Sequence, residues 1–262
     1  MLYAVSSLKG FEIKATDGSL GTVSDFLFDD NTWKLRWMVV DTGRWLTGRK
    51  VLIHPSAVTS AEYGARELNV ALTKAQVEDS PDILQDRPVS QKIQNDLYGY
   101  YGWDPLWGGG MFGGGMYGGG MGGIASPMSA PAYFGTAAVR DAERHGTDVD
   151  EGDPHLRSII EVTGYHVNAT DGDIGHIQDV LIDNASWNIR YFIVDTSNWW
   201  FGQHVLVSPY AVKSVDWSDR HVRLEISKDR VKSSPPWNPA ELIAEEYERR
   251  LHKHYGWPGY GW

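Results

Sequence analysis

The chain has 262 residues, which suits two domains of ordinary size, and 42% of them are hydrophobic, enough for real cores. It carries 34 acidic against 24 basic residues, a formal charge of -10, which argues against nucleic-acid binding and against simple electrostatic docking on anionic lipid. Cysteine is absent, which excludes disulfides, thiolate nucleophiles and cysteine-ligated metal centres.

The first residues show no basic segment followed by a long apolar one, so we expect no signal peptide. The apolar runs are the length of strands, far short of the roughly 20 residues that a membrane helix needs. We therefore expect a cytoplasmic protein without a membrane span, and peripheral attachment through a protein partner stays open.

In residues 1–82 the sequence predicts a series of short strands. They are expected at 11–14, 20–28, 34–41, 50–54 and 67–72. Asp17 and Gly18 fit the tight turn of the first hairpin, because glycine readily takes a positive φ. The strand at 34–41 is apolar on both faces, with Leu35, Trp37 and Val39 on one and Met38 and Val40 on the other. No crossover helix intervenes, which favours a small antiparallel barrel or sandwich.

A helical extension is predicted at 83–103, with its helix near 88–97. Residues 104–153 read as a flexible linker rich in Gly and Met, since GGGMFGGGMYGGGMGG at 108–123 offers little to pack. Self-association of that tract is the alternative. Residues 236–262 predict a C-terminal helix, capped by Asn238 and followed by an aromatic tail. Its apolar stripe comprises Leu242, Ile243, Tyr247 and Leu251.

The chain repeats itself at a constant offset of 154 residues. TDG occurs at 16–18 and again at 170–172, and YGW at 101–103 and again at 255–257. About a third of the aligned residues are identical without a gap, which coincidence of composition does not produce. The second strand-rich domain is therefore expected at 154–235.

These repeated residues resemble the PRC-barrel family. The resembling pattern is G-[FY]-x-[IV]-x-A-T-D-G-x-[LI]-G, then W-x-[LI]-R-[WY], V-D-T, W-x-x-G and V-L-[IV]-x-P. It stands at 10–21, 33–37, 40–42, 45–48 and 51–55, and again at 164–175, 187–191, 194–196, 199–202 and 205–209. The resemblance implies two small PRC-type β-barrels, like those of the photosynthetic reaction-centre H subunit and of ribosome-maturation factors. In both settings the barrel is understood as an adaptor that docks on other proteins.

The sequence offers no catalytic, cofactor-binding or metal-binding constellation, and we expect no enzyme activity and no cofactor. The carboxylates in turns and at strand ends are interpreted as structural, capping backbone amides or pairing with Arg36 or Arg190. They are Asp25, Asp29, Asp41, Asp179, Asp183 and Asp195. The turn and ion-pair residues singled out are Asp17, Gly18, Arg36, Asp41, Asp171, Gly172, Arg190 and Asp195.

The candidate interface is a pair of aromatic loop tips. It comprises Trp45, Leu46, Trp199, Trp200 and Phe201. Exposed aromatic residues at a tip are typical binding hot spots, whereas tips folded over the domain would only close its core. Pairing of the two domains, within or between chains, is expected.

The function that we predict is a non-enzymatic scaffold or adaptor with tandem PRC-barrels and an unidentified protein partner. One alternative is a peripheral subunit or assembly factor of a membrane photosynthetic or electron-transfer complex. Another is a small-ligand binder or an enzyme with a site between the barrels.

Overall fold

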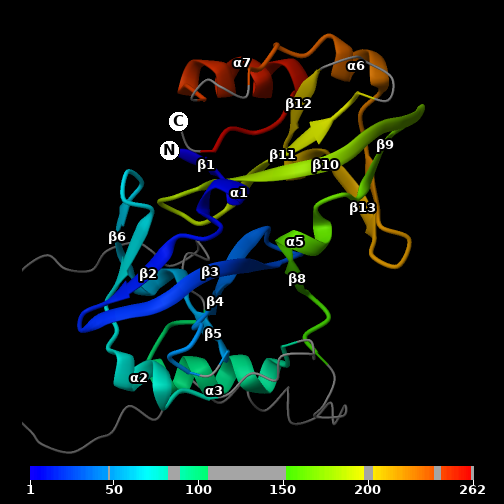
Figure 1. Ribbon diagram of the computed structural model, residues 1–262. Helices are drawn as coiled ribbons and strands as arrows, with labels where there is room; N and C mark the ends of the chain where they lie inside the picture. Colours follow the sequence, from blue (N-terminus) through cyan, green and yellow to red (C-terminus); the bar gives the residue numbers. More distant parts are fainter. Residues whose placement is uncertain (47, 82–88, 106–151, 198–202, 239–242, 261–262) are drawn as a thin grey trace, which may run out of the picture.

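The computed structural model describes the chain except residues 47, 82–88, 106–151, 198–202, 239–242 and 261–262 (Figure 1). The predicted Gly/Met-rich tract therefore lies outside the described residues. We refer to residues 1–105 as the first repeat and to 152–262 as the second.

Both repeats contain the same succession of elements. The first has β1 (Leu2–Ala4), α1 (Val5–Leu8), β2 (Glu12–Ala15), β3 (Gly18–Asp29), β4 (Lys34–Asp41), β5 (Lys50–Ile53), the 3₁₀ turn η1 (Pro55–Ala57), β6 (Val58–Glu62), β7 (Glu67–Val70), α2 (Lys74–Glu78) and α3 (Gln91–Tyr101). The second has β8 (Leu156–Ser158), α5 (Ile159–Val162), β9 (His166–Ala169), β10 (Gly172–Asp183), β11 (Ile189–Asp195), β12 (His204–Val207), η2 (Pro209–Ala211), β13 (Val212–Asp216), β14 (His221–Leu224), α6 (Lys228–Lys232) and α7 (Glu245–Tyr255).

Each repeat builds most of a seven-stranded sheet. The strand orders are β5-β4-β3-β2-β7-β6 and β12-β11-β10-β9-β14-β13. All neighbours are antiparallel except β2 with β7 and β9 with β14, which are parallel. The prediction of closed antiparallel barrels is corrected on both counts. The described strands at the two ends of each order do not pair with each other, and each sheet includes one parallel pair.

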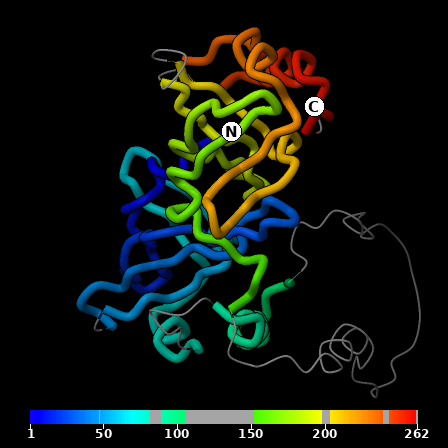
Figure 2. Tube along the Cα trace, turned by 90° about the vertical axis from the view of Figure 1, so that its right-hand side faces the viewer, coloured from blue at the N-terminus to red at the C-terminus, as the bar shows by residue number. Residues whose placement is uncertain are grey.

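The seventh strand of each sheet comes from the other repeat. Strand β1 pairs antiparallel with β10, Leu2 opposite Asp183 and Ala4 opposite Leu181. Strand β8 pairs in the same way with β3. Figure 1 shows β1 entering the upper sheet and β8 reaching the lower one, and Figure 2 shows the same stacking of the two repeats from the side. The exchange is reciprocal and relates the repeats by a pseudo-two-fold axis.

At that axis the turns before β4 and β11 contact each other. The Leu35 amide donates to the Trp187 carbonyl at 2.9 Å, and the Ile189 amide donates to the Trp33 carbonyl at 2.8 Å. Both tryptophans have left-handed backbones, with φ of 55° and 57°, which costs free energy in a bulky residue. Part of the backbone strain therefore lies where the repeats meet, and the turns at Arg66 and Arg220 carry the rest of the described left-handed non-glycine residues.

One continuous core runs through both repeats. Strand β4 is apolar on both faces because it lies between this core and a second apolar cluster. Met38 and Val40 face that core, whereas Trp37 and Val39 belong to a second cluster beneath α3. A register shift opposite Leu27 and Phe28 turns Leu35 towards the core common to both repeats. Leu35 and Trp37 therefore lie on opposite faces of β4, and the prediction that they share a face was wrong. Strand β4 is thus buried on both sides without a closed barrel.

The long strands β3 and β10 each need one glycine. A Cβ atom at Gly21 would lie 2.0 Å from the Asp41 carbonyl oxygen, and one at Gly175 would lie 1.8 Å from that of Asp195. Both glycines also have positive φ, 138° and 123°. No other residue type fits there, because a side chain would collide with backbone atoms that cannot move aside.

A helix covers the outer side of each sheet, α3 on the first repeat and α7 on the second (Figure 1). Both differ from the predicted bounds. Helix α3 begins after Ser90, whose hydroxyl accepts from the Ile93 amide, and extends past residue 97 to Tyr101. Helix α7 begins at Glu245 with Ala244 at its N-cap, so Asn238 does not cap it.

Candidate interaction site

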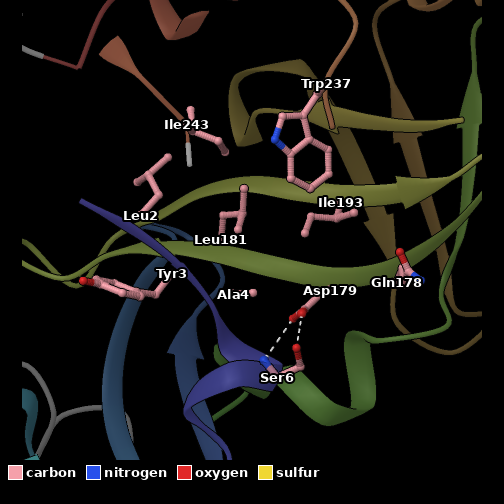
Figure 3. A pocket seen from close by; sticks show the side chains of 10 residues that line it. All are labelled: Leu2, Tyr3, Ala4, Ser6, Gln178, Asp179, Leu181, Ile193, Trp237 and Ile243. Carbon is pink, nitrogen blue, oxygen red and sulfur yellow. Dashed lines mark hydrogen bonds between the residues drawn. The ribbon is translucent and has the colours of Figure 1, made fainter. Parts of the chain in front are cut away.

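A groove of about 580 Å³ lies beside the exchanged strand β1. Its floor is formed by Leu181 of β10 and Ile193 of β11, and Leu2 of β1 forms one wall (Figure 3). Trp237 and Ile243, from the chain that leads to α7, complete the lining, Ile243 next to Leu2 and Trp237 above Ile193. The groove therefore exists only because a strand of the first repeat lies on the sheet of the second.

One end of the groove is polar and already bonded. The Ser6 hydroxyl donates to Asp179 at 2.5 Å, and the Ser6 amide donates to the same carboxylate at 3.2 Å. Both bonds are visible in Figure 3. A carboxylate that caps the start of α1 in this way holds the exchanged strand in place. Asp179 thus accepts from a backbone amide, the kind of contact that the sequence predicted for the turn and strand-end carboxylates.

Trp237 brings an uncommitted donor to the groove. The indole Nε1 atom is buried and has no hydrogen-bond partner among the described residues. A buried N–H without an acceptor costs free energy, so an acceptor brought by a bound group would be stabilised there. The combination of an apolar floor, an aromatic wall and one donor suits an apolar side chain next to a carbonyl group.

A buried row of polar side chains lies under α7. The Tyr191 hydroxyl donates to Glu248 Oε1 at 2.9 Å and lies 2.8 Å from His252 Nε2. His252 Nδ1 lies 2.5 Å from the Pro258 carbonyl oxygen, to which it donates. Burial raises the pKa of Glu248 and lowers that of His252, because it disfavours both charged forms. This row fastens α7 and the tail after it to the sheet.

Under α3, Trp37 and Gln94 take the positions of Tyr191 and Glu248, and neither has an ionisable side chain. Trp37 Nε1 donates to Gln94 Oε1 at 3.0 Å, and Gln94 Nε2 donates to Asp153 Oδ2 at 2.8 Å. Tyr98 takes the position of His252. Beside it, His54 is 1% exposed and packs edge-on against the Trp37 ring. Its pKa is lowered to about 4, chiefly by burial and further by the charges of Lys34 and Arg36.

Only one of the two predicted aromatic loop tips lies among the described residues. Trp45 and Leu46 are half-buried against the core, and Lys74 Nζ lies 4.6 Å from the centre of the Trp45 ring. Their counterparts Trp199, Trp200 and Phe201 lie outside the described residues. The interface assigned to these tips stays a prediction.

The predicted turn residues serve the backbone. Asp17 Oδ1 accepts from the Lys74 amide and Asp171 Oδ1 from the Lys228 amide, both at 2.8 Å. Each is followed by a glycine of positive φ, 144° at Gly18 and 136° at Gly172.

Two arginines form ion pairs with the aspartates that end β3 and β10, whereas the aspartates that end β4 and β11 accept from backbone amides. Arg36 contacts Asp29 at 3.0 Å, and Arg190 contacts Asp183 at 2.5 Å. The remaining pair caps turns instead, since Asp41 accepts from the Gly43 amide and Asp195 from the Ser197 amide.

Sequence reasoning missed the groove because it missed the exchange. Strands of three residues show no periodicity, so nothing at 2–4 or 156–158 predicts a strand. The usable signal was the repeat itself, which aligns these two segments with each other and Asp25 with Asp179.

In the described part of the chain, no three His, Asp or Glu side chains gather in a way that could hold a metal ion. Nor is any described helix long and apolar enough to span a bilayer.

Two like sheets that exchange a strand define a protein built by duplication of one small β module. The model of the PRC-barrel domain matches residues 1–77 and 161–231, more than half of the chain. The chain therefore belongs to the PRC-barrel family and contains the domain twice. No curated protein matches it.

Proposed function

We propose that this tandem PRC-barrel protein is a non-enzymatic adaptor whose groove beside β1 receives an apolar segment of a protein partner. The observation that carries the proposal is the groove itself, with its apolar floor and the unpartnered Nε1 of Trp237. Aromatic side chains in such hollows supply much of the binding free energy of protein interfaces. Membership of the PRC-barrel family supports an interaction role.

The test is cross-linking in cells followed by capture of the tagged full chain. We expect Trp237→Ala to reduce recovery of a specific partner at least tenfold, since a central aromatic residue contributes about 2 kcal/mol or more to such a contact. Tyr100→Ala, an exposed aromatic residue on α3, is the matched control and should leave recovery unchanged. Equal recovery with both variants would contradict the assignment of the groove. Trp199→Ala with Trp200→Ala forms a third arm that tests the predicted loop tip.

A second candidate is a small-ligand binder, favoured by a hollow of about 410 Å³ between the repeats. Leu8 and Tyr63 of the first repeat and Ile182 and Trp187 of the second are among its lining residues. A compound that raises the melting temperature of the wild type, and fails to do so with Tyr63→Ala, would favour this candidate over the adaptor. Placement next to a membrane photosynthetic or electron-transfer complex is a narrower form of the adaptor proposal, and co-fractionation of the captured partner with membranes would support it.

A further inference from the structure

The two places where the repeats exchange strands are alike in backbone but differ in charge. We propose that the repeats are mutually specific partners: each binds the other in preference to a second copy of itself. Asp30 and Lys34 of the first repeat, with Arg157 and Asn188 of the second, set this choice. The proposal does not depend on the adaptor function.

Part of the contact is common to both junctions and would be equally satisfied in a self-pair. Asp25 accepts from the Ser158 hydroxyl at 2.5 Å and from the Ile160 amide at 3.3 Å. Its counterpart Asp179 accepts from the hydroxyl and the amide of Ser6. These carboxylates hold an exchanged strand whichever repeat supplies it. They favour pairing without choosing the partner.

The residues that distinguish the two partners begin directly after β3 and β10. Asp30, whose side chain is 9% exposed, contacts Arg157 Nε at 3.1 Å and His155 Nδ1 at 2.9 Å. The equivalent position of the second repeat is Asn184, which faces Met1 and the strand that carries Tyr3. A pair of second repeats would thus place Arg157 and His155 against an uncharged amide.

A pair of first repeats would lose the same contact from the other side. The Asp30 carboxylate would then face Met1 and Tyr3 in place of His155 and Arg157. When Met1 is extended, so that no terminal ammonium stands beside Asp30, this mostly buried carboxylate keeps its desolvation cost and loses the compensating attraction.

The second element of choice lies on the pseudo-two-fold axis. Lys34, 6% exposed, stands opposite Asn188 in an antiparallel bridge. Because the two positions are equivalent in the repeats, two first repeats would bring Lys34 opposite a second Lys34. Like charges directly opposite each other on paired strands are destabilising, and more so when they are shielded from water. Only the mixed pair satisfies Asp30 and avoids this repulsion.

The test uses the full chain with a specific protease site inserted within 106–151 and a short peptide before Met1. That peptide keeps a free terminal ammonium from replacing Arg157 beside Asp30. The protein is cut, unfolded in urea, refolded and examined by native mass spectrometry. We expect mixed pairs of the two fragments to exceed self-pairs about tenfold or more over the statistical two-to-one-to-one mixture. A statistical mixture, or a majority of self-pairs, would overturn the proposal.

A substitution that moves the carboxylate gives a sharper readout. Asn184→Asp should raise the share of second-repeat self-pairs several-fold, because Arg157 and His155 then find a carboxylate there. Ser214→Asp adds the same charge at an exposed position on β13 and should change nothing.

If the cut chains do not refold, the uncut chain tests the same choice of partner. Chains that carry both Asp30→Asn and Asn184→Asp should form dimers in sedimentation analysis at concentrations where the wild type is monomeric. A doubly substituted chain that stays monomeric with the melting temperature of the wild type would refute the assigned residues.

Discussion

At the scale of single residues, His54 shows how position decides the charge of a side chain. It lies within a group of aromatic rings, with the centres of Tyr98 and Trp103 each 5.7 Å from its own. Its Nδ1 accepts from the Ser56 amide at 3.3 Å and lies 2.7 Å from the Ser56 hydroxyl. The same position in the second repeat is Ser208, which does not titrate.

We predict that His54 makes the protein sensitive to mild acid. Its folded pKa of about 4 lies below the unfolded value of 6.5, so the unfolded chain takes up the proton first as pH falls. The stabilisation is complete above pH 6.5 and is lost between there and about pH 4, in total about 3 kcal/mol. Urea unfolding across this range measures it.

His54→Ser and His54→Gln are the two comparison variants. Both should show a shallower fall in unfolding free energy between these pH values, whatever their stability at pH 7. If either variant keeps the slope of the wild type, His54 is not its source.

At the scale of elements, α3 and α7 cover equivalent faces with different chemistry. Helix α3 uses the neutral amide of Gln94, whereas α7 places the carboxyl group of Glu248 against Tyr191 with 9% of the residue exposed. Burial is the main cause of the raised pKa of Glu248, and the charge of Asp183 adds to it while that of Arg190 opposes it.

We predict that Glu248→Gln stabilises the protein at neutral pH relative to its effect in acid. A carboxyl group with a raised folded pKa contributes most below its unfolded pKa, and that contribution is lost as pH rises through the folded value. The unfolding free energy of the variant minus that of the wild type should therefore grow between pH 4 and pH 7. A difference that stays constant over this range would show that the Glu248 carboxyl group carries no burial cost.

At the scale of the whole molecule, the fold consists of two like sheets, and each receives one strand from the other repeat. The sequence predicted β4 at its observed bounds and the strands β2, β3, β5 and β7 to within a few residues, because each has an alternating or continuous apolar pattern between clear turns. It did not predict β6, β13 or the exchanged strands. Strand β6, with three polar residues among its five, presents too little apolar surface to mark it.

The exchange could not be read from the sequence for a further reason. Strand β1 has two docking strands of similar sequence available, its own β3 and the β10 of the other repeat. The choice between them depends on the path of the chain after residue 4 and on contacts such as Ser6 with Asp179. Such contacts join residues far apart in the sequence, and no local pattern contains them. The groove, which the exchanged strand completes, was invisible for the same reason.

The most direct test of the reciprocal exchange is a pair of double-cysteine variants in this cysteine-free chain. Ala4 stands opposite Leu181 in the exchanged arrangement, whereas its partner within its own repeat would be Leu27, the equivalent of Leu181. We predict that Ala4→Cys with Leu181→Cys forms an intramolecular disulfide under mild oxidation, detected by peptide mass spectrometry on the monomer band of a non-reducing gel. Ala4→Cys with Leu27→Cys should remain reduced. A disulfide in the second variant and none in the first would show that β1 folds back on its own repeat, and would contradict the exchange.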